Sequence, residues 1–336
     1  MSRSAVTLSD VARSLNLSTC TVSKILNRSF KGFSYSPETI RRVEKAAVRL
    51  NYTANAQARS LRTSKSMLVG FLLPSAEFFL FGALTDRLER ELRTWGYQVL
   101  SVHSRNDVQE EKELIPTLLS RGIDGLIWIP SQSRFSPSEM GLRTGLPAII
   151  LDRPFCTTEL PFVATDNRAA AQELAKRIRQ EGHRSAVVIN AAAQDRSMKE
   201  RCQGMTDVFG KNLRTIDVPN DAAEAKKAIL AFIGLEKKRP TVLVALSEAL
   251  AIGTLAGLRE LNMSIPSEIS FAAFDDFPLA SHWSPRITVV QQDLEKLASQ
   301  SAQLLLQRMK SPRKNFENIR IPAQLVWRES VGRPPF

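Results

Sequence analysis

From residue 67 onward the sequence alternates short apolar runs with longer amphipathic stretches, and this alternation constrains the fold more strongly than any other feature. The first run, 67–73 (MLVGFLL), ends at Pro74, as a buried parallel strand would. We expect further strands at 98–103, 125–129, 148–151, 162–165, 186–189, 215–218, 242–246, 270–274 and 288–290, and one or two in 319–329. We expect helices at 82–94, 110–120, 168–181, 199–209, 221–233, 250–261 and 294–309.

This order of strands and helices is typical of doubly wound parallel sheets with helices on both faces. The segment has about 270 residues, more than one such sheet needs, so two lobes are expected. Ligands of such sheets bind beyond the carboxyl ends of the strands. The polar pairs expected there are Pro74-Ser75, Asp152-Arg153, Thr165-Asp166, Ser247-Glu248 and Asp275-Asp276. They suit a hydroxylated or charged small molecule, although Ser75 and Asp166 could equally cap the helices that follow them.

The beginning of the chain has a different pattern, which is typical of a helix-turn-helix. Ser18 can cap a helix within the stretch 17–27 (LSTCTVSKILN). One face of that helix carries Val22, Ile25 and Leu26, and the opposite face carries Thr19, Cys20, Ser23, Lys24 and Asn27. The apolar face can therefore pack, while the polar face can approach base edges in the DNA major groove.

Two further short helices are expected around this one. The first carries Leu8, Val11, Ala12 and Leu15 at helical spacing, with Thr7 or Ser9 as its cap. The third follows a cap, a first-turn proline and a first-turn acid, Ser36-Pro37-Glu38, and its apolar positions are Ile40, Val43, Ala47 and Leu50. Three helices of this size can share one small core, and the alternative interpretation is a small helical bundle of another kind.

The placement of charge favours a nucleic-acid partner. The net charge is +12, and residues 1–66 hold 12 lysines and arginines against 3 acidic residues, a net of +9. The rest of the chain therefore carries only +3. A module that neutralises DNA phosphates needs such a cationic surface, whereas a basic stretch without a helix-turn-helix is more often only a solvated surface.

Composition places the protein in the cytoplasm, away from membranes. With 336 residues, 43% hydrophobic and 24% charged, the chain indicates a soluble globular protein of two or three domains. We find no run of 18 apolar residues and no signal-peptide pattern at the N-terminus. The three cysteines, Cys20, Cys156 and Cys202, are odd in number and widely spaced, which indicates free thiols in a reducing compartment.

Enzyme chemistry has no motif behind it. The sequence lacks the glycine-rich nucleotide loops, the His-Glu-x-x-His and Cys-x-x-Cys metal patterns and the Gly-x-Ser-x-Gly nucleophile turn, so we expect no catalytic residues, metal or cofactor. The histidines His103, His183 and His282 are far apart, and we expect His183 to act as a cation at a helix C-terminus. Gly253 and Gly257, four residues apart, predict close packing of a helix on a sheet.

The segment between the two parts, 51–66, begins with a polar, alanine-rich stretch that is too weakly amphipathic to form a stable helix alone. We interpret it as a linker that becomes helical on binding.

With these residues in hand, the whole chain resembles the lactose/galactose-repressor family of bacterial transcription regulators. The most specific motifs are 6–12 (VTLSDVA) and 18–27 (STCTVSKILN). The others are Ser36-Pro37-Glu38-Thr39, Leu50-Asn51-Tyr52, Ala58-Arg59-Ser60-Leu61, Gly182-His183-Arg184, Arg201 with Gly204, Phe274-Asp275-Asp276 and Gln292-Asp293.

The resemblance implies roles at the DNA. Thr19, Cys20 and Lys24 match positions that read bases, and Lys24 stands where arginine is commonest, so its selectivity for guanine is expected to be looser. Leu61 matches a leucine that wedges into the minor groove and kinks the DNA. The remaining positions implied in DNA binding are Ser18, Thr21, Ser23, Asn27, Tyr52, Asn55 and Ala58, while Ala54 replaces a proline that is usual in the hinge.

The resemblance also implies a ligand cleft between the lobes. The matching positions are Phe79, Asp152, Arg201, Ser247, Glu248, Asp275 and Gln292. Arg201 and Asp275 would suit hydroxyl groups, as on a sugar. Ser247-Glu248 stands where Asn-Asp is usual, and this departure argues against a plain sugar as the ligand.

These inferences define three regions: a headpiece at 1–50, a hinge at 51–66 and a ligand-binding and dimerisation domain at 67–336. The family fold makes the chain cross between the lobes near Thr165, Ser281 and Ile321. The first lobe is then about 67–164 plus 282–321, and the second about 165–281 plus 322–336.

The leading hypothesis is a homodimeric regulator, expected to be a repressor, that binds a near-palindromic operator in double-stranded DNA and is gated by a small-molecule effector. The alternative is a solute-binding protein of the same two-lobed fold, which the cationic headpiece and the missing secretion signal oppose. An enzyme built on this fold is the third option.

Overall fold

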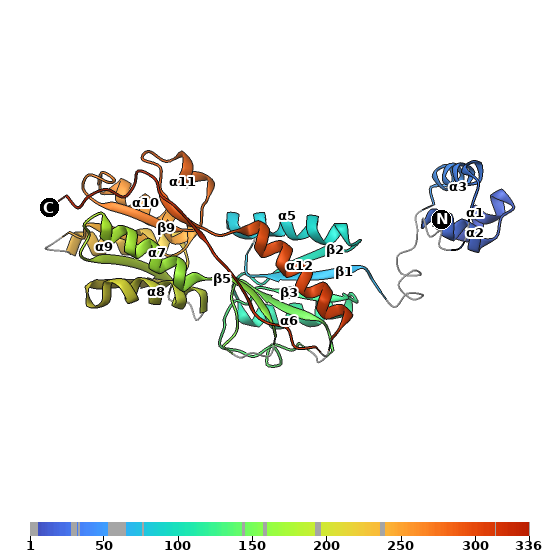
Figure 1. The fold of residues 1–336 in the computed structure, drawn as a ribbon, viewed down its shortest axis with the longest axis horizontal. Helices are drawn as coiled ribbons and strands as arrows, with labels where there is room; N and C mark the ends of the chain where they lie inside the picture. Colours follow the sequence, from blue (N-terminus) through green and yellow to red (C-terminus); the bar gives the residue numbers. More distant parts are fainter. Residues whose placement is uncertain are drawn as a thin grey trace. The chain divides into compact units, whose positions relative to one another are not determined.

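The computed structural model describes residues 6–27, 32, 34–52, 65–75, 77–142, 145–156, 160–191, 196–235, 239–312 and 314–335. The chain divides into two compact units, Met1–Ser66, which contains the expected headpiece and hinge, and Met67–Phe336, the two-lobed unit (Figure 1). The expected hinge residues Asn55, Ala58 and Leu61 lie outside the described residues.

The headpiece contains three helices, α1 (Leu8–Leu15), α2 (Thr19–Leu26) and α3 (Pro37–Arg49). Thr7, not Ser9, caps α1: its hydroxyl accepts the Asp10 N–H at 3.3 Å, and the Asp10 carboxylate accepts the Thr7 N–H at 2.9 Å. Ser18 caps α2 by accepting the Thr21 N–H at 3.0 Å. These caps fix where each helix begins.

One apolar core joins the three helices. Its fully buried members are Val11, Ala12, Val22, Ile25, Val43, Ala46 and Ala47. The predicted cores of all three helices are represented among them, so the expected three-helix headpiece is confirmed.

The first lobe is built on a six-stranded sheet in the order β11-β5-β4-β3-β1-β2, and every pairing in it is parallel. The strands are β1 (Leu68–Leu73), β2 (Gln98–His103), β3 (Gly125–Trp128), β4 (Ala148–Leu151), β5 (Phe162–Thr165) and β11 (Ile319–Ile321). Two apolar clusters cover its two faces. Helices α5 (Phe79–Thr94) and α12 (Leu294–Lys310) lie on one face, and α6 (Val108–Ser120) lies on the other (Figure 1).

The second lobe has its own six-stranded sheet in the order β12-β10-β9-β8-β6-β7. Its strands are β6 (Ala186–Ala191), β7 (Leu213–Val218), β8 (Val242–Ala245), β9 (Ser270–Phe274), β10 (Thr288–Gln291) and β12 (Gln324–Val326). The predicted parallel pairing is confirmed with one exception, because β12 runs antiparallel to β10. The two lobes confirm the doubly wound α/β architecture.

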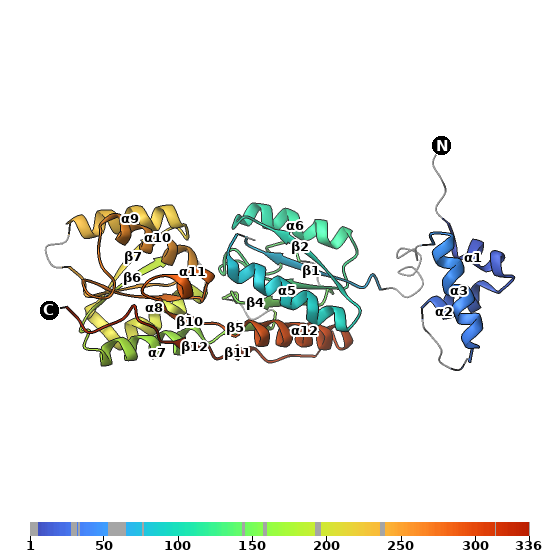
Figure 2. The same cartoon turned by 90° about the horizontal axis from the view of Figure 1, so that it is seen from above.

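Helices cover both faces of the second sheet as well. Helices α7 (Asn167–Gln180) and α8 (Arg196–Phe209) lie on one side, and α9 (Ala222–Leu235) and α10 (Glu248–Glu260) lie on the other (Figure 2). The short helices η1 (Gly210–Asn212) and α11 (Pro278–His282) complete the lobe. No helix in the described parts of the chain is long and apolar enough to cross a membrane.

The chain passes between the two sheets three times: after Thr165, between Gln291 and Leu294, and between Ile321 and Gln324. The crossing expected near Ser281 was placed about ten residues too early. The reason is that β10 hydrogen-bonds to β9 and β12, so 282–291 belongs to the second lobe rather than the first. The sheet to which a strand belongs is shown by the strands it pairs with, and a local apolar run in the sequence does not identify them.

Close contacts at two glycines join neighbouring helices of the second lobe. A Cβ on Gly253 of α10 would lie 2.2 Å from the Ala222 carbonyl oxygen of α9, and a Cβ on Gly204 of α8 would lie 2.4 Å from the Arg168 carbonyl oxygen of α7. The expectation that Gly253 and Gly257 pack on a sheet was therefore wrong, because a Cβ on Gly257 would also meet α9, at Ile229. These glycines let helices approach one another.

The expected role of His183 as a helix-terminal cation was also wrong. The side chain is only 1% exposed, its Nε2 donates to the Gly332 carbonyl at 2.9 Å, and its Nδ1 lies 2.8 Å from the Thr241 hydroxyl. Burial lowers the pKa of His183 below its ordinary value, and the bond to Gly332 and the charge of Glu181 oppose this only partly. The folded protein thus favours the neutral imidazole, which joins the tail of the chain to the sheet.

A pH dependence of stability follows from this burial. Because the pKa of His183 is lower in the folded than in the unfolded chain, its contribution to stability is fully present above the unfolded value, and it is lost as pH falls through the folded one. We expect His183→Gln, which can still donate to the Gly332 carbonyl, to flatten the loss of stability on acidification below about pH 6.5. Urea unfolding of both proteins across this range measures the slope, and equal slopes would contradict the expectation.

Candidate functional site

The recognition helix α2 presents the side chains that were predicted to read DNA. Ser18, Thr19 and Cys20 are exposed at its first turn, while Val22 and Ile25 are buried in the headpiece core. The helix is therefore anchored on one side and open on the other, as a helix that enters a groove must be.

The other predicted DNA contacts lie further along the same helix or just beyond the third. Thr21, Ser23 and Lys24 are half-buried, and the exposed Asn27 donates through Nδ2 to the Ser23 carbonyl at 2.7 Å. Tyr52 is half-buried and packs against the headpiece core. Asn27 and Tyr52 thus hold local structure as well as bordering the exposed face of the headpiece.

A cavity lies between the two lobes, and it is called the cleft here. It is a narrow cavity that opens to solvent at its mouth. Its lining residues are Phe78, Leu80, Phe81, Asp152, Arg153, Ser197, Met198, Arg201, Asn220, Ser247, Glu248, Ala249 and Asp275. Five of the seven residues predicted for a ligand are among them: Asp152, Arg201, Ser247, Glu248 and Asp275.

Arg201 is the central cation of the cleft. It projects from α8, and its side chain is only 2% exposed. Its Nε donates to the Asn167 side-chain oxygen at 2.8 Å, and its Nη1 donates to the Leu246 carbonyl at 2.7 Å and to Asp275 Oδ2 at 3.4 Å. The guanidinium also stacks 4.6 Å from the centre of the Phe274 ring. Arg201 is thus fixed in one orientation by its surroundings.

Asp275 follows β9 directly, in a left-handed backbone conformation with φ of 70°. Its Oδ1 accepts from Gln292 Nε2 at 2.7 Å, and the Gln292 Oε1 in turn accepts from the Thr165 hydroxyl at 2.5 Å. Because Thr165 ends a strand of the first lobe, this chain of hydrogen bonds connects the cleft to the crossing segments.

Glu248 begins α10 and reaches across to the first lobe. Its Oε1 accepts the backbone N–H of Phe79 at 3.3 Å, at the start of α5, where no side chain of the preceding residue caps the helix. Burial raises the pKa of Glu248 above its ordinary value and the Asp275 carboxylate raises it further, while the backbone N–H groups of Phe79 and Leu80 oppose the increase. The carboxyl group is thus a lobe-to-lobe contact in an acidic environment.

Two predicted ligand residues do not line the cleft. Phe79 is 46% exposed, and both Phe79 and Gln292 border a neighbouring, solvent-open cavity. Helix α5 begins at Phe79, three residues earlier than expected, and Phe78 and Phe81 line the cleft instead. Gln292 supports Asp275 from outside the cavity.

Sequence reasoning missed Ser197 and Asn220, which both line the cleft. Ser197 donates to the Asp152 carbonyl at 2.6 Å, and Asn220 accepts from the Ser247 hydroxyl at 2.6 Å. The rule that ligands bind beyond carboxyl strand ends could have found them, because they follow β6 and β7 as Asp275 follows β9. The same rule overreached at Asp166, whose carboxylate caps α7 through the Ala169 N–H at 3.2 Å.

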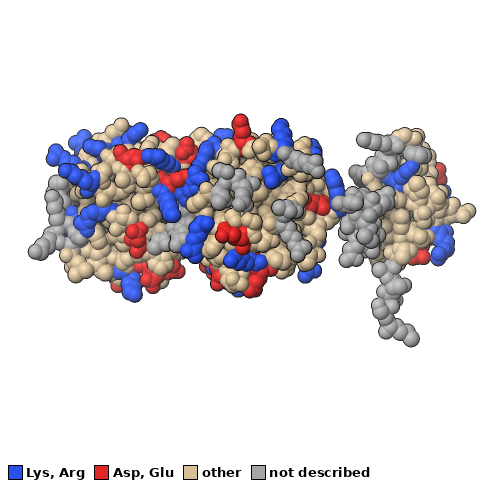
Figure 3. Space-filling view, turned by 90° about the horizontal axis from the view of Figure 1, so that it is seen from below, with Lys and Arg blue, Asp and Glu red and all other residues tan. Residues whose placement is uncertain are grey.

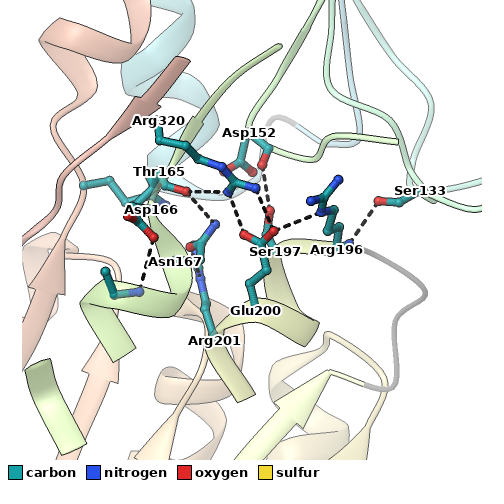
Figure 4. Close-up of polar contacts among 12 residues, drawn as sticks. Ser133, Asp152, Thr165, Asp166, Asn167, Arg196, Ser197, Glu200, Arg201 and Arg320 are labelled. Carbon is teal, nitrogen blue, oxygen red and sulfur yellow. Dashed lines mark hydrogen bonds and ion pairs between the residues drawn. The ribbon is translucent and has the colours of Figure 1, made fainter. Parts of the chain in front are cut away.

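Further contacts hold the lobes together at the start of α8. Arg320 on β11 of the first lobe donates to both carboxylate oxygens of Glu200, at 2.6 and 2.7 Å, and Arg196 donates to Glu200 at 2.9 Å (Figure 4). The backbone N–H of Arg196 also donates to the Ser133 hydroxyl at 3.0 Å. The lobes therefore contact one another on the α8 side of the cleft as well as through Glu248.

Comparison with known proteins identifies both parts of the chain. Residues 7–55 match the bacterial regulatory proteins of the lacI family, and residues 175–331 match the periplasmic binding protein-like domain. Catabolite control protein A of Staphylococcus aureus is 26% identical over 326 residues, 96% of this chain and 98% of that protein. The transcriptional repressor PurR of Proteus mirabilis is 26% identical over 341 residues, 98% of each chain.

Solved structures share the fold. The lac repressor dimer bound to operator and the anti-inducer ONPF has a TM-score of 0.83 at 22% identity, over 98% of this chain and 100% of that one. A LacI family regulator from Enterococcus faecium with bound ribose has a TM-score of 0.70 at 23% identity, over 80% of this chain and 99% of that one.

A helix-turn-helix headpiece joined to a two-lobed periplasmic binding protein-like domain defines a class of transcription regulators. Residues 7–55 of this chain match the lacI family model, and the chain as a whole is similar to transcription regulators of this organisation.

Proposed function

We propose that this protein is a cytoplasmic transcription repressor, without enzymatic activity, that binds a near-palindromic operator as a homodimer. A small molecule in the cleft changes the fraction of protein that is competent to bind DNA. The observation that carries the proposal is the presence, in one chain, of an anchored recognition helix with an exposed polar face and a buried polar cleft between two lobes.

The distribution of charge supports DNA as the partner of the headpiece. Residues 1–66 carry +9 of the total +12. On the face of the molecule drawn in Figure 3, acidic and basic side chains are interspersed across the two lobes. A solute-binding protein of this fold would have no use for a cationic helix-turn-helix, so the headpiece separates the two hypotheses.

The assignment of a homodimer rests on the relatives and on exposed apolar side chains. The lac repressor of the compared structure is a dimer on its operator. In the present chain Phe79, Ile252 and Leu279 are large apolar residues that are 46%, 36% and 41% exposed. A second copy of the chain could cover such side chains, and a dimer would supply one headpiece for each half of a palindrome.

Fluorescence anisotropy with a palindromic site from the gene's own promoter tests the proposal. We expect salt-sensitive, sequence-selective binding by a dimer, and weaker binding to a single half-site. The same titration with a panel of sugars, sugar acids and nucleobases tests the gating. Binding that does not distinguish the site from scrambled DNA would count against operator recognition.

Lys24→Ala is expected to weaken binding to the cognate site by about 1–3 kcal/mol and to relax the preference at one base pair. The reason is that Lys24 stands at a base-reading position of α2 and can donate to guanine O6 and N7. Lys45→Ala on α3 removes the same charge from an exposed position outside α2 and is the matched control. If Lys24→Ala weakens binding to cognate and scrambled DNA equally, Lys24 contacts phosphate instead.

A further inference from the structure

The Glu248 carboxylate in the cleft is only partly satisfied by the described residues. Glu248 is 8% exposed, its Oε1 accepts from Phe79, the backbone N–H of Leu80 also acts on the carboxylate, and Oε2 is buried without a hydrogen bond of normal geometry. Buried carboxylate oxygens are normally paired, and leaving one unpaired is costly. The oxygen belongs to a residue that lines the cleft, so a ligand there can supply the missing donor.

The cleft offers Glu248 no positive charge of its own. Arg201 is already occupied by Asn167, the Leu246 carbonyl and Asp275. Arg153 donates to Asn106 at 3.2 Å and its guanidinium lies 5.6 Å from the centre of the Phe81 ring. No ion pair of Glu248 is found in the described part of the chain.

The balance of charge around the cleft is acidic. Asp152, Glu248 and Asp275 face two guanidinium groups, those of Arg153 and Arg201. The stretches 157–159 and 192–195, which lie outside the described residues and adjoin cleft segments in sequence, contain no lysine or arginine. A ligand that brings a positive charge would therefore relieve an excess of buried negative charge, whereas a neutral hydroxyl would only satisfy one hydrogen bond.

We propose that Glu248 selects ligands that carry an aliphatic ammonium group on a small hydroxylated molecule, as amino sugars do. The ammonium would donate to Oε2 while Oε1 keeps its bond to Phe79. Asp275 and Arg201 would meet hydroxyl groups of the same ligand. This selectivity rests on the proposed function of the cleft as the effector site.

A purely structural role for Glu248 makes a different prediction. Capping α5 needs only the oxygen that accepts the Phe79 N–H, and glutamine keeps such an oxygen. Glu248→Gln should then leave ligand selectivity unchanged. Selection by charge requires the negative charge of the carboxylate. Glutamine lacks that charge, and its NH2 group, a donor, would face the ammonium group of the ligand.

Calorimetry on the full chain without DNA tests the proposal. Glucosamine, galactosamine and mannosamine are each compared with the parent hexose and with the N-acetyl derivative, which lacks the charge. We expect at least one amino sugar to bind about 10- to 100-fold more tightly than both neutral counterparts. Glu248→Gln is expected to reduce this ratio to near one.

Glu260→Gln provides the matched control, because it makes the same charge change at the other end of α10, where Glu260 pairs with Lys226 at 2.6 Å outside the cleft. It should keep the amino-sugar preference. The proposal is overturned if the neutral sugars bind as tightly as the amino sugars, if Glu248→Gln keeps the preference, or if no amino sugar binds. Should Glu248→Gln fail to fold, the wild-type comparison of amino and N-acetyl sugars decides alone.

The outcomes also separate this inference from the proposed function. A neutral sugar that binds in preference to its amino counterpart and changes operator affinity would overturn the amino-sugar selectivity and leave the gated regulator intact. An amino sugar that binds through Glu248 without any effect on operator affinity would support the amino-sugar selectivity and contradict the gating of the regulator.

Discussion

Replacing Arg201 by alanine is expected to lower the free energy of unfolding of the two-lobed unit by about 3–5 kcal/mol. The change would leave the Leu246 carbonyl and the Asp275 carboxylate buried without the donor that now serves both. Arg201 is 2% exposed, so water cannot replace the guanidinium at low cost. Arg201→Ala is therefore expected to be among the most destabilising single changes in the second lobe.

Urea unfolding followed by tryptophan fluorescence, to which Trp283 and Trp327 of the second lobe contribute, measures the loss. Arg286→Ala is the matched control, because Arg286 pairs with Glu329 in the same lobe but on an exposed surface. That control should change the unfolding midpoint little. A midpoint for Arg201→Ala that equals that of the control would show that the buried hydrogen bonds of Arg201 contribute nothing net.

Gly253→Val is the second change for which a large effect is expected, a loss of about 3 kcal/mol or more. Glycine inside a helix normally costs about 1 kcal/mol relative to alanine, so a substitution in α10 would ordinarily stabilise. Here the first added carbon would lie 2.2 Å from the Ala222 carbonyl oxygen and 2.7 Å from the Ala225 Cβ. Backbone atoms cannot move aside cheaply, so the two helices would have to separate.

Two glycine-to-alanine variants, each of which adds a single carbon, compare a crowded site with an open one. Gly253→Ala is expected to destabilise, while Gly234→Ala in the last turn of α9, where nothing lies within 4 Å of the added Cβ, should be neutral or slightly stabilising. Thermal unfolding of both variants gives the sign. Stabilisation by Gly253→Ala would mean that α9 and α10 can separate without loss.

Much of the fold could be predicted because it depends on local rules. The caps at Ser18 and Ser36 and the apolar face of the recognition helix follow from hydrogen bonding and from the helical period, which act within a few residues. The alternation of strands and helices along the sequence likewise predicted the two lobes. The helix starts differed by a few residues, as at α5, where Glu248, which lies far along the chain, accepts the backbone N–H of Phe79.

The cleft was partly predictable. Parallel strands end at one edge of a sheet, so Ser247-Glu248 and Asp275, which follow the neighbouring strands β8 and β9, could be placed together from the sequence. Asp152 follows β4 of the other sheet, and the family resemblance placed it in the same cleft. The hydrogen bonds that these residues make could not be predicted from the sequence. Gln292 donates to Asp275 from a crossing segment, and Phe79 donates to Glu248 from the other lobe. The burial of His183 could not be predicted, because its partners Thr241 and Gly332 lie far along the chain.

The three passages between the sheets have a practical consequence for protein engineering. Neither lobe corresponds to one continuous stretch of the gene, since the first sheet ends with β11 and the second with β12, both beyond residue 318. A hybrid that exchanges one lobe with a relative therefore needs three splice points, at about Thr165, Gln292 and Pro322. A single-junction chimera would instead pair strands from two parents within the same sheet.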